Sequence, residues 1–451
     1  MFRHTKKAVA GLFAAAAVMF AAVPAMAAVD PETAYVFNTF SFLFNGALVM
    51  WMAAGFAMLE SGLVRSKNTA TICLKNIALY SIAGIMFYLV GYSLMYTDVS
   101  GYIGSFALFY NPSDAELTLL GAEEATSEMV DAVVGGRYSV ASDWFFQMVF
   151  VATAASIVSG TLAERIKLWP FLIFVIVLTA IIYPIQGSWT WGGGWLAEMG
   201  FSDFAGSTIV HSVGGWAAVT GALILGARKG KYGPDGRVNP MPGANLPLAT
   251  LGTFILWLGW FGFNGGSQLA LGSALDATAM AIVFTNTNLA AAGGVVAAML
   301  MTQIMYKKVD LTMALNGALA GLVSITAGPD LTNHLMSIII GGIGGVLVVI
   351  AIPMLDRFKI DDVVGAISVH LVAGIWGTLA VGIFGAGDIG VQIIGILAIA
   401  VFVIVSSSIV WLALKYTIGI RVSDEDEDAG LDMVELGLEA YPEFGRGSQR
   451  G

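Results

Sequence analysis

A succession of apolar segments, each about 20 residues long, is the feature that most restricts how this chain can fold. An α-helix needs about 20 apolar residues to cross a hydrocarbon core about 30 Å thick. Charged residues make up only 12% of the 451-residue chain, compared with about 25% in soluble domains. The sequence therefore predicts an all-α integral membrane protein with eleven transmembrane helices. The predicted spans lie near 35–62, 69–96, 143–163, 168–187, 205–227, 247–267, 276–305, 310–328, 333–355, 361–385 and 388–418.

The basic residues indicate which way the spans run. Short cytoplasmic connections are enriched in lysine and arginine. With the N-terminus outside and eleven spans, only Arg137 falls in an outer connection. The C-terminus is then predicted to lie inside. The basic residues of the connections that count as cytoplasmic are Arg65, Lys67, Arg165, Lys167, Arg228, Lys229, Lys231, Arg237, Lys307, Lys308, Arg357, Lys359 and Arg421.

The two ends of the chain differ in composition from the rest. Residues 1–27 combine early basic residues, an Ala-rich apolar stretch and an Ala-x-Ala site, which predicts a signal peptide, with an uncleaved anchor as the alternative. Residues 28–420 form the predicted transmembrane domain, and residues 421–451 form a cytoplasmic tail that we expect to be regulatory. The formal charge of −10 sits in the 97–142 connection and the acidic tail. Without a basic stripe, the sequence gives no support to nucleic-acid binding.

One short pattern occurs twice. Asp203 precedes His211 by eight residues in the predicted fifth span, and Asp362 precedes His370 by the same distance in the tenth. An odd separation of five spans makes the two copies run in opposite directions. The pattern therefore predicts an inverted repeat of spans 1–5 and 6–10, as in many transporters.

His211 and His370 are predicted to reach the middle of the membrane, about 12 Å along the helix from their aspartates. A single histidine there is usually a satisfied core residue, but two matched copies favour a function. Burial favours neutral rings, one donating and one accepting a hydrogen bond. A metal site would need further ligands, which the mid-span sequence lacks. The pair suits conduction of a small neutral or deprotonable molecule. Separately, we expect Glu60 and Lys75 to form a salt bridge, because unpaired charges at that depth are costly.

Several motifs along the chain are specific in sequence. The most specific stretch runs from Asp203 through His211 to Arg228. Further motifs are Leu162-Ala163-Glu164-Arg165, Trp191-Gly192-Gly193-Gly194, Gly259-Trp260-Phe261-Gly262-Phe263-Asn264 and Asp361-Asp362 leading to Val369-His370. Over roughly residues 30 to 441, the sequence resembles the ammonium transporters of the Amt/Mep/Rh superfamily, in particular the bacterial Amt type.

The resemblance implies a role for each matched position. It implies an outer vestibule where Trp191, Phe150 and Ser267 receive ammonium, with Phe150 and Phe263 stacked below as a gate. Asp203 would shape the vestibule. The resemblance further makes His211 and His370 the twin histidines of the pore. The full expected site comprises Phe150, Trp191, Ser267, Phe263, His211, His370 and Asp203.

The family further implies a homotrimer of eleven-span subunits, ammonium, ammonia and methylammonium as substrates, no cofactor, no metal, and a multi-pass location in the bacterial inner membrane. Two departures stand out. Gly365 replaces the acidic residue that many relatives carry five positions before the second histidine. In the tail, Leu436-Gly437-Leu438 replaces a His-Gly-Glu triplet of some relatives. The resemblance also implies docking of a PII-type signal protein at the tail, where this triplet differs.

The leading hypothesis is a transporter that deprotonates ammonium and conducts ammonia through an apolar pore for nitrogen uptake. An ammonium sensor that signals through its tail is the alternative, and the shortness of the tail is an argument against it. An intramembrane hydrolase with a histidine base would be an enzyme, but no serine or cysteine lies in a recognisable partner motif.

Overall fold

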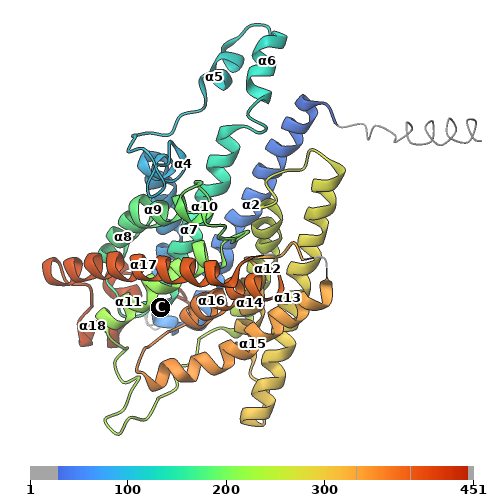
Figure 1. Ribbon diagram of the computed structural model, residues 1–451. Coiled ribbons are helices and arrows are strands. Elements are labelled where there is room, and N and C mark those ends of the chain that lie inside the picture. The colour runs from blue at the N-terminus through green and yellow to red at the C-terminus, as the bar shows by residue number, and fades with distance from the viewer. Residues whose placement is uncertain (1–28, 332, 386, 445–451) are drawn as a thin grey trace, which may run out of the picture.

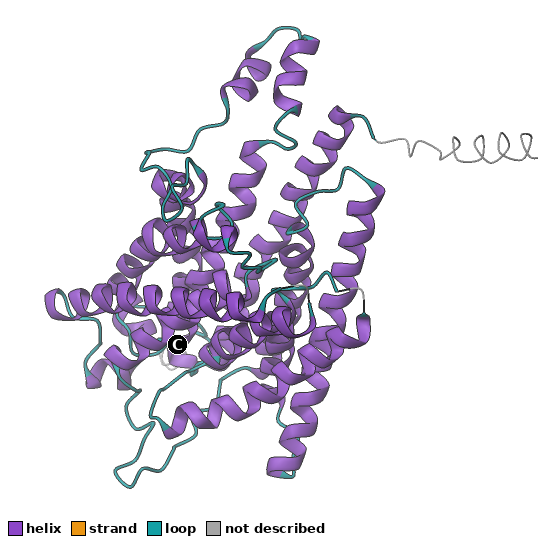
Figure 2. Cartoon of the chain, in the orientation of Figure 1, coloured by secondary structure: helices purple, strands orange, loops and turns teal. Residues whose placement is uncertain are grey.

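The computed structural model describes residues 29–331, 333–385 and 387–444, so the predicted signal peptide lies outside the described residues. Across these ranges the secondary structure is helical (Figure 2), with two isolated β-bridges and no strand. The all-α prediction is confirmed.

The ten α-helices of the described ranges with at least 12 residues form most of the bundle (Figure 1). They are α2 (Pro31–Leu63), α3 (Thr69–Met86), α7 (Val140–Thr161), α11 (Val213–Leu225), α12 (Leu246–Gly266), α13 (Ala274–Tyr306), α14 (Leu311–Ile325), α15 (His334–Arg357), α16 (Ala373–Phe384) and α17 (Ile389–Thr417).

Four spans contain a π-helical turn, a local widening that is frequent at functional sites. These turns extend or interrupt the neighbouring α-helices. The segments concerned are η2 (Phe87–Gly91) with α4 (Tyr92–Tyr96), η3 (Leu178–Ile182) between α8 (Leu168–Val177) and α9 (Tyr183–Ser188), η4 (Ser207–Ser212) before α11, and η5 (Ile367–Val372) before α16. The connections and the tail hold η1 (Ser66–Asn68), α5 (Asp114–Gly121), α6 (Ser127–Val134), α10 (Trp195–Glu198), α18 (Asp424–Ala429) and η6 (Asp432–Leu436).

Among the described residues, ten helical segments are long and apolar enough to cross a membrane. The predicted eighth span corresponds to α14, which has 15 residues and therefore rises only about 22 Å. Every residue of α14 from 314 to 325 is buried. The helix thus lies inside the protein, among α13, α15 and α16.

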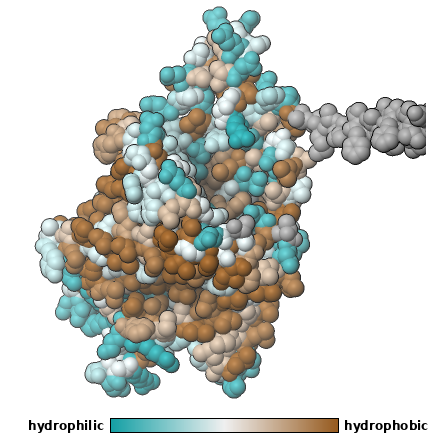
Figure 3. All heavy atoms as spheres, viewed as in Figure 1, coloured by the Kyte–Doolittle hydropathy of each residue, from teal (hydrophilic) through white to brown (hydrophobic). Residues whose placement is uncertain are grey.

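Hydrophobic side chains cover the middle of the molecule in the view of Figure 3, and hydrophilic ones gather at its two ends. One end carries α5 and α6, and the other carries the connection between α11 and α12 (Figure 1). We call these the α5–α6 side and the tail side, because the tail packs at the second. Exposed apolar side chains such as Phe40, Leu223, Leu300 and Val401 suit contact with lipid.

Helices α2 and α12 cross with their backbones in close contact. A Cβ atom added to Gly62 would lie 2.5 Å from the amide nitrogen of Ala249, and one added to Gly252 would lie 2.4 Å from that of Leu59. Small residues permit such approach where helices pack in membranes. The first predicted span therefore packs against the sixth, which is its counterpart in the expected inverted repeat.

A buried charge cluster joins four connections on the tail side. Arg228 donates from Nε and Nη2 to the two carboxylate oxygens of Asp361, each at 2.9 Å. Glu164 pairs with Arg65 and lies 3.4 Å from Arg228 Nη1. Bidentate arginine–carboxylate geometry adds orientation as well as attraction. The cluster links the ends of α2, α7, α11 and α15.

The tail packs against the connection between α2 and α3. The carboxylate of Asp432 accepts hydrogen bonds from the amides of Ala70 and Thr71, at 2.9 and 2.8 Å, at the start of α3. Lys67 Nζ donates to the carbonyls of Glu427 and Asp428, both at 2.7 Å. Residues 421–444 are therefore folded onto the bundle instead of extending from it as a separate acidic segment.

Candidate functional site

Asp203 caps the first of two helices that meet at the centre of the bundle. Its carboxylate accepts hydrogen bonds from the amides of Gly206, Ser207, Thr208 and Ile209 at 2.8–3.0 Å. These amides are the unpaired donors at the start of η4, where negative charge is favourable. Asp203 is 3% exposed, so its carboxylate fixes the direction of the helix that carries His211.

Asp362 has the same place before the second helix. Its Oδ2 accepts from the amides of Ile367 and Ser368, at 2.8 and 3.3 Å, at the start of η5. Gly206 and Gly365 lie at matching offsets, and both have positive φ, +108° and +83°. L-residues with side chains rarely adopt this conformation. The departure at Gly365 is therefore explained by the local backbone, which is the counterpart of that at Gly206.

The two helices cross with reciprocal contacts. A Cβ atom added to Gly215 would lie 2.6 Å from Leu371, and one added to Gly374 would lie 2.6 Å from Ser212. Each glycine follows its own histidine by four residues, and each contacted residue follows the other histidine by one. A pair of helices related by a two-fold axis would pack in this way.

His211 and His370 meet at this crossing. Their Nδ1 atoms lie 3.2 Å apart, and their rings are stacked at an interplanar angle of 24°. The residues are 0% and 3% exposed. Between two neutral rings, one Nδ1 carries a hydrogen atom and donates the hydrogen bond, and the other Nδ1 accepts this bond. One Nε2 atom is then a donor and the other an acceptor, and Nε2 of His211 has no partner.

Aromatic rings fix the position of His211. Trp260 stacks on it at a centroid distance of 4.9 Å and Phe263 at 5.2 Å. Nε1 of Trp260 donates to the hydroxyl of Thr326 at 2.9 Å, which orients the indole. The neighbouring rings therefore hold the imidazole in a rigid apolar environment. This restricts the direction in which its Nε2 atom can form a hydrogen bond.

The expected vestibule residues lie directly next to this group. Phe150 stacks on Phe263 with centroids 4.0 Å apart, and Trp191 contacts Phe150 edge-on at 6.0 Å. Both phenylalanines are at most 1% exposed. The hydroxyl of Ser267 donates to the carbonyl of Phe263 at 2.8 Å, which leaves its oxygen lone pairs free to accept from another donor. The structure thus brings all the expected site residues into one continuous group.

The expected direct contact between Glu60 and Lys75 is replaced by a bridge. Lys75 Nζ donates to the carbonyl of Ser159 at 3.0 Å, and the hydroxyl of Ser159 donates to Glu60 Oε2 at 2.8 Å. No ion pair within 4.0 Å joins the two heads in the described chain. The prediction of a direct salt bridge is wrong, because Ser159 lies between the charges and bonds to both.

Sequence reasoning missed several contributors to the site. Thr208 and Thr378 share a hydroxyl hydrogen bond of 2.6 Å across the helix crossing. Gln186 Nε2 donates to the carbonyl of Ile209, within η4, at 3.0 Å. Trp260, which stacks on His211, was also not among the expected site residues. It lies inside one of the matched motifs, and this motif could have indicated it. Within the described ranges, no group of three or more His, Cys, Asp or Glu side chains could hold a metal ion.

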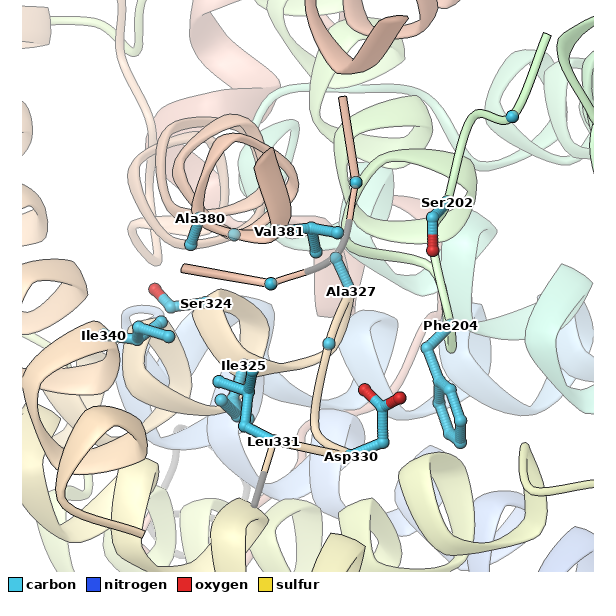
Figure 4. A pocket seen from close by; sticks show the side chains of 15 residues that line it. Ser202, Phe204, Ser324, Ile325, Ala327, Asp330, Leu331, Ile340, Ala380 and Val381 are labelled. Carbon is cyan, nitrogen blue, oxygen red and sulfur yellow. The ribbon is translucent and has the colours of Figure 1, made fainter. Parts of the chain in front are cut away.

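A cavity of about 400 Å³ lies away from this site (Figure 4). Ser202, Phe204, Asp330, Leu331 and Val381 line it, together with glycines of the neighbouring loops. None of the expected site residues contributes to its wall. This cavity is therefore distinct from the group formed by the expected site residues.

Comparison with known proteins decides the family. A model described as the Ammonium Transporter Family matches residues 40–441. The ammonium transporter Amt2 of Archaeoglobus fulgidus is 40% identical over 433 residues, covering 88% of this chain and 87% of that protein. The chain belongs to the ammonium transporter family. A putative ammonium transporter of Synechocystis is 41% identical over 395 residues, with 86% of each chain covered.

Solved structures of the ammonium transporter family share the fold. One titled Sensor Amt Protein is 36% identical, with a TM-score of 0.81 over 89% of this chain and 99% of that one. Mep2 of Candida albicans is 27% identical, with a TM-score of 0.75 over 88% of this chain and 89% of that one. The relatives are named as transporters, so this multi-pass membrane protein is a transporter-type protein and the hydrolase alternative is excluded.

Proposed function

We propose that this protein recruits ammonium, removes its proton, and conducts ammonia between His211 and His370 for nitrogen uptake. The observation that carries the proposal is the buried Nδ1–Nδ1 contact of 3.2 Å beneath the stacked Phe150 and Phe263 rings. An ion that cannot lose its charge would find no charged ligand among His211, His370, Phe150 and Phe263. A neutral molecule with one lone pair and three N–H bonds can bond to both kinds of ring nitrogen.

Recruitment is assigned to the group formed by Trp191, Phe150 and Ser267. Aromatic faces attract a small cation, and the free lone pairs of the Ser267 hydroxyl accept one of its N–H bonds. Asp203 acts through structure, because four amides already occupy its carboxylate. Phe150 and Phe263 then form a gate that the substrate passes after it has shed water.

Selectivity follows from the proton. Potassium has a charge like that of ammonium but no proton to release. It would have to enter the low-dielectric pore as an ion, at a cost of several kcal/mol. Ammonium can release its proton and cross the same low-dielectric pore in the form of neutral ammonia. This ammonia finds hydrogen-bonding partners at the two histidines. We expect methylammonium to follow the same route.

The proposed topology has eleven spans, with α14 as the eighth. The α5–α6 side, with the N-terminus, faces outward, and the tail side faces the cytoplasm, in agreement with the basic residues of its connections. Residues 1–27 are the proposed signal peptide, 28–420 the transmembrane domain and 421–451 the cytoplasmic regulatory tail. The reciprocal glycine contacts support an inverted repeat of spans 1–5 and 6–10.

Assembly and location rest on the family. We propose a homotrimer in the bacterial inner membrane, each subunit with its own pore. A PII-type signal protein is the expected partner of the folded tail, where the Leu436-Gly437-Leu438 departure lies on the tail side at the end of η6. No cofactor or metal is required by the proposed chemistry.

An ammonium sensor remains the second candidate, because a neighbour at 36% identity is titled Sensor Amt Protein. Uptake of isotope-labelled methylammonium into proteoliposomes separates the two functions. A transporter accumulates the label at a rate proportional to the protein content, and excess ammonium suppresses this uptake. A sensor binds ammonium but leaves uptake at the rate of protein-free liposomes, and that result would overturn the proposal.

A further inference from the structure

Glu60 and Lys75 form a buried charged pair that the proposed function leaves without a role. Glu60 lies near the end of α2 and Lys75 near the middle of α3, and each is 1% exposed. Burying two charges in a membrane protein is costly, and such groups in transporters often mark a substrate or proton path. Their position on the tail side of His370 makes this pair the strongest candidate for such a path.

The surroundings of the pair keep one carboxylate oxygen free. Glu60 Oε2 accepts from the Ser159 hydroxyl at 2.8 Å and from Asn76 Nδ2 at 3.3 Å. Lys75 Nζ bonds to the Ser159 carbonyl and lies 4.7 Å from the centre of the Phe171 ring. Glu60 Oε1 is buried and has no partner. A purely structural carboxylate would be expected to have both oxygens satisfied.

A small cavity connects Glu60 with the pore. Glu60, His370, Asn316 and Val364 all line it, and its volume of about 10 Å³ is room for about one water molecule. Gly160 keeps this space open, because a Cβ atom there would lie 2.5 Å from Val364 and 3.6 Å from the Glu60 carboxyl carbon. One water in the cavity would stand between the imidazole of His370 and the carboxylate.

We propose that Glu60 is a proton-accepting residue at the cytoplasmic end of the pore, held in place by Ser159 and Asn76, with the charge of Lys75 nearby. The proposal rests on the proposed transport function. A proton released by ammonium to the histidines leaves a His370 nitrogen and passes to the cavity water, which gives up one of its own protons to Glu60 Oε1. An N–H bond breaks, an O–H bond forms, and the water is restored.

The second step returns the proton. Ammonia leaving the pore takes it from the neutral Glu60 carboxyl group and becomes ammonium, and the carboxylate is restored beside Lys75. One ammonium enters and one leaves, so atoms and charge balance. The positive charge of Lys75 acts in the direction of this release, because it favours the carboxylate over the protonated carboxyl group.

The test compares charge with substrate in the same proteoliposomes. Solid-supported membrane currents and labelled methylammonium uptake are measured for the wild type, Glu60→Gln and Glu116→Gln. Glu116 is a buried glutamate of the α5 capping box, remote from the pore, and serves as the matched control. We expect Glu60→Gln to lower the ratio of current to uptake about tenfold or more while uptake continues. Glu116→Gln should keep the wild-type ratio.

Glu60→Gln leaves the Lys75 ammonium without its counter-charge, so the double variant Glu60→Gln/Lys75→Gln is measured beside it. If the single variant does not yield monodisperse protein, the double variant is judged by the same ratio. An unchanged ratio in the folded variant overturns the proposal, as does uptake without current in the wild type. Loss of uptake together with current would place Glu60 on the substrate path and overturn its proton role. Absence of uptake by the wild type would instead reject the transport function itself.

Discussion

At the scale of single residues, the site depends on which polar atoms already have partners. The carboxylate of Asp203 is saturated by backbone amides, and the hydroxyl hydrogen of Ser267 is donated to the Phe263 carbonyl. Of these two side chains, Ser267 is the one whose lone pairs remain available. The prediction of a structural Asp203 and a binding Ser267 agrees with this division, and their functional roles remain predictions.

Replacing Ser267 by alanine should weaken recruitment without closing the pore. The variant loses one hydrogen bond to a charged substrate, worth about 1.5 kcal/mol or more, so the half-saturating ammonium concentration should rise about tenfold. Concentration series of ammonium-evoked currents measure this shift. Ser273→Ala, at the exposed start of α13, is the control. An unchanged half-saturating concentration would remove Ser267 from the binding site.

At the scale of elements, the sequence was most informative where a pattern reports one local structure. The spacing of Asp203 and His211 and its copy with Asp362 and His370 correctly indicated two equivalent helix starts. The sequence could not show that each start is π-helical or that the two imidazoles stack, because these features arise from packing between distant segments. The bridging Ser159 was missed for the same reason, since it comes from a third helix.

The charge cluster at the helix ends offers a test of stability. Asp361→Asn should destabilise the protein by about 3–5 kcal/mol, because it leaves the buried Arg228 without its bidentate partner. Asp356→Asn breaks the partly exposed contact with Lys231, 3.1 Å long, and should cost less than about 1 kcal/mol. Thermal unfolding in detergent compares the two variants. Equal effects would show that the buried cluster contributes no more than a surface pair.

The same cluster gives a pH dependence. Burial raises the pKa of Asp361, but the hydrogen bonds from Arg228 and the charges of Arg165 and Arg228 outweigh it and hold the pKa well below its usual value. The folded state therefore binds this proton less readily than the unfolded chain. The stabilisation is complete above the unfolded pKa of about 4 and is lost as the pH falls below it.

At the scale of the whole molecule, the hydrophobic pattern predicted the helical class and the ends of most spans. The short α14 shows where that reasoning reaches its limit, because a helix buried within the protein need not match the thickness of the bilayer. The folded tail could not be read from its acidic sequence. Its order comes from Asp432, which bonds to the start of α3, and from the backbone of Glu427, which bonds to Lys67 just before that helix; both partners lie more than three hundred residues earlier.

The docked tail should control transport. Asp432→Ala removes the acceptor for two amides at the start of α3, so we expect the tail to detach and uptake in cells to fall less after a pulse of ammonium than in the wild type. Asp424→Ala changes an exposed carboxylate of the same acidic run and should leave the response intact. Limited proteolysis checks detachment. If Asp432→Ala and deletion of residues 424–451 both preserve uptake and its response, the tail is not regulatory.

The central claim is that the contact between His211 and His370 carries the selective step. The most direct measurement is paired uptake of labelled methylammonium and labelled rubidium into proteoliposomes containing the wild type, His211→Ala or His370→Ala, with size-exclusion profiles as the folding control. We expect each alanine variant to fold but to lose most selective methylammonium uptake, because the remaining imidazole has no hydrogen-bond partner and the proton has no acceptor. Wild-type methylammonium uptake with unchanged rubidium exclusion in both folded variants would contradict the twin-histidine mechanism.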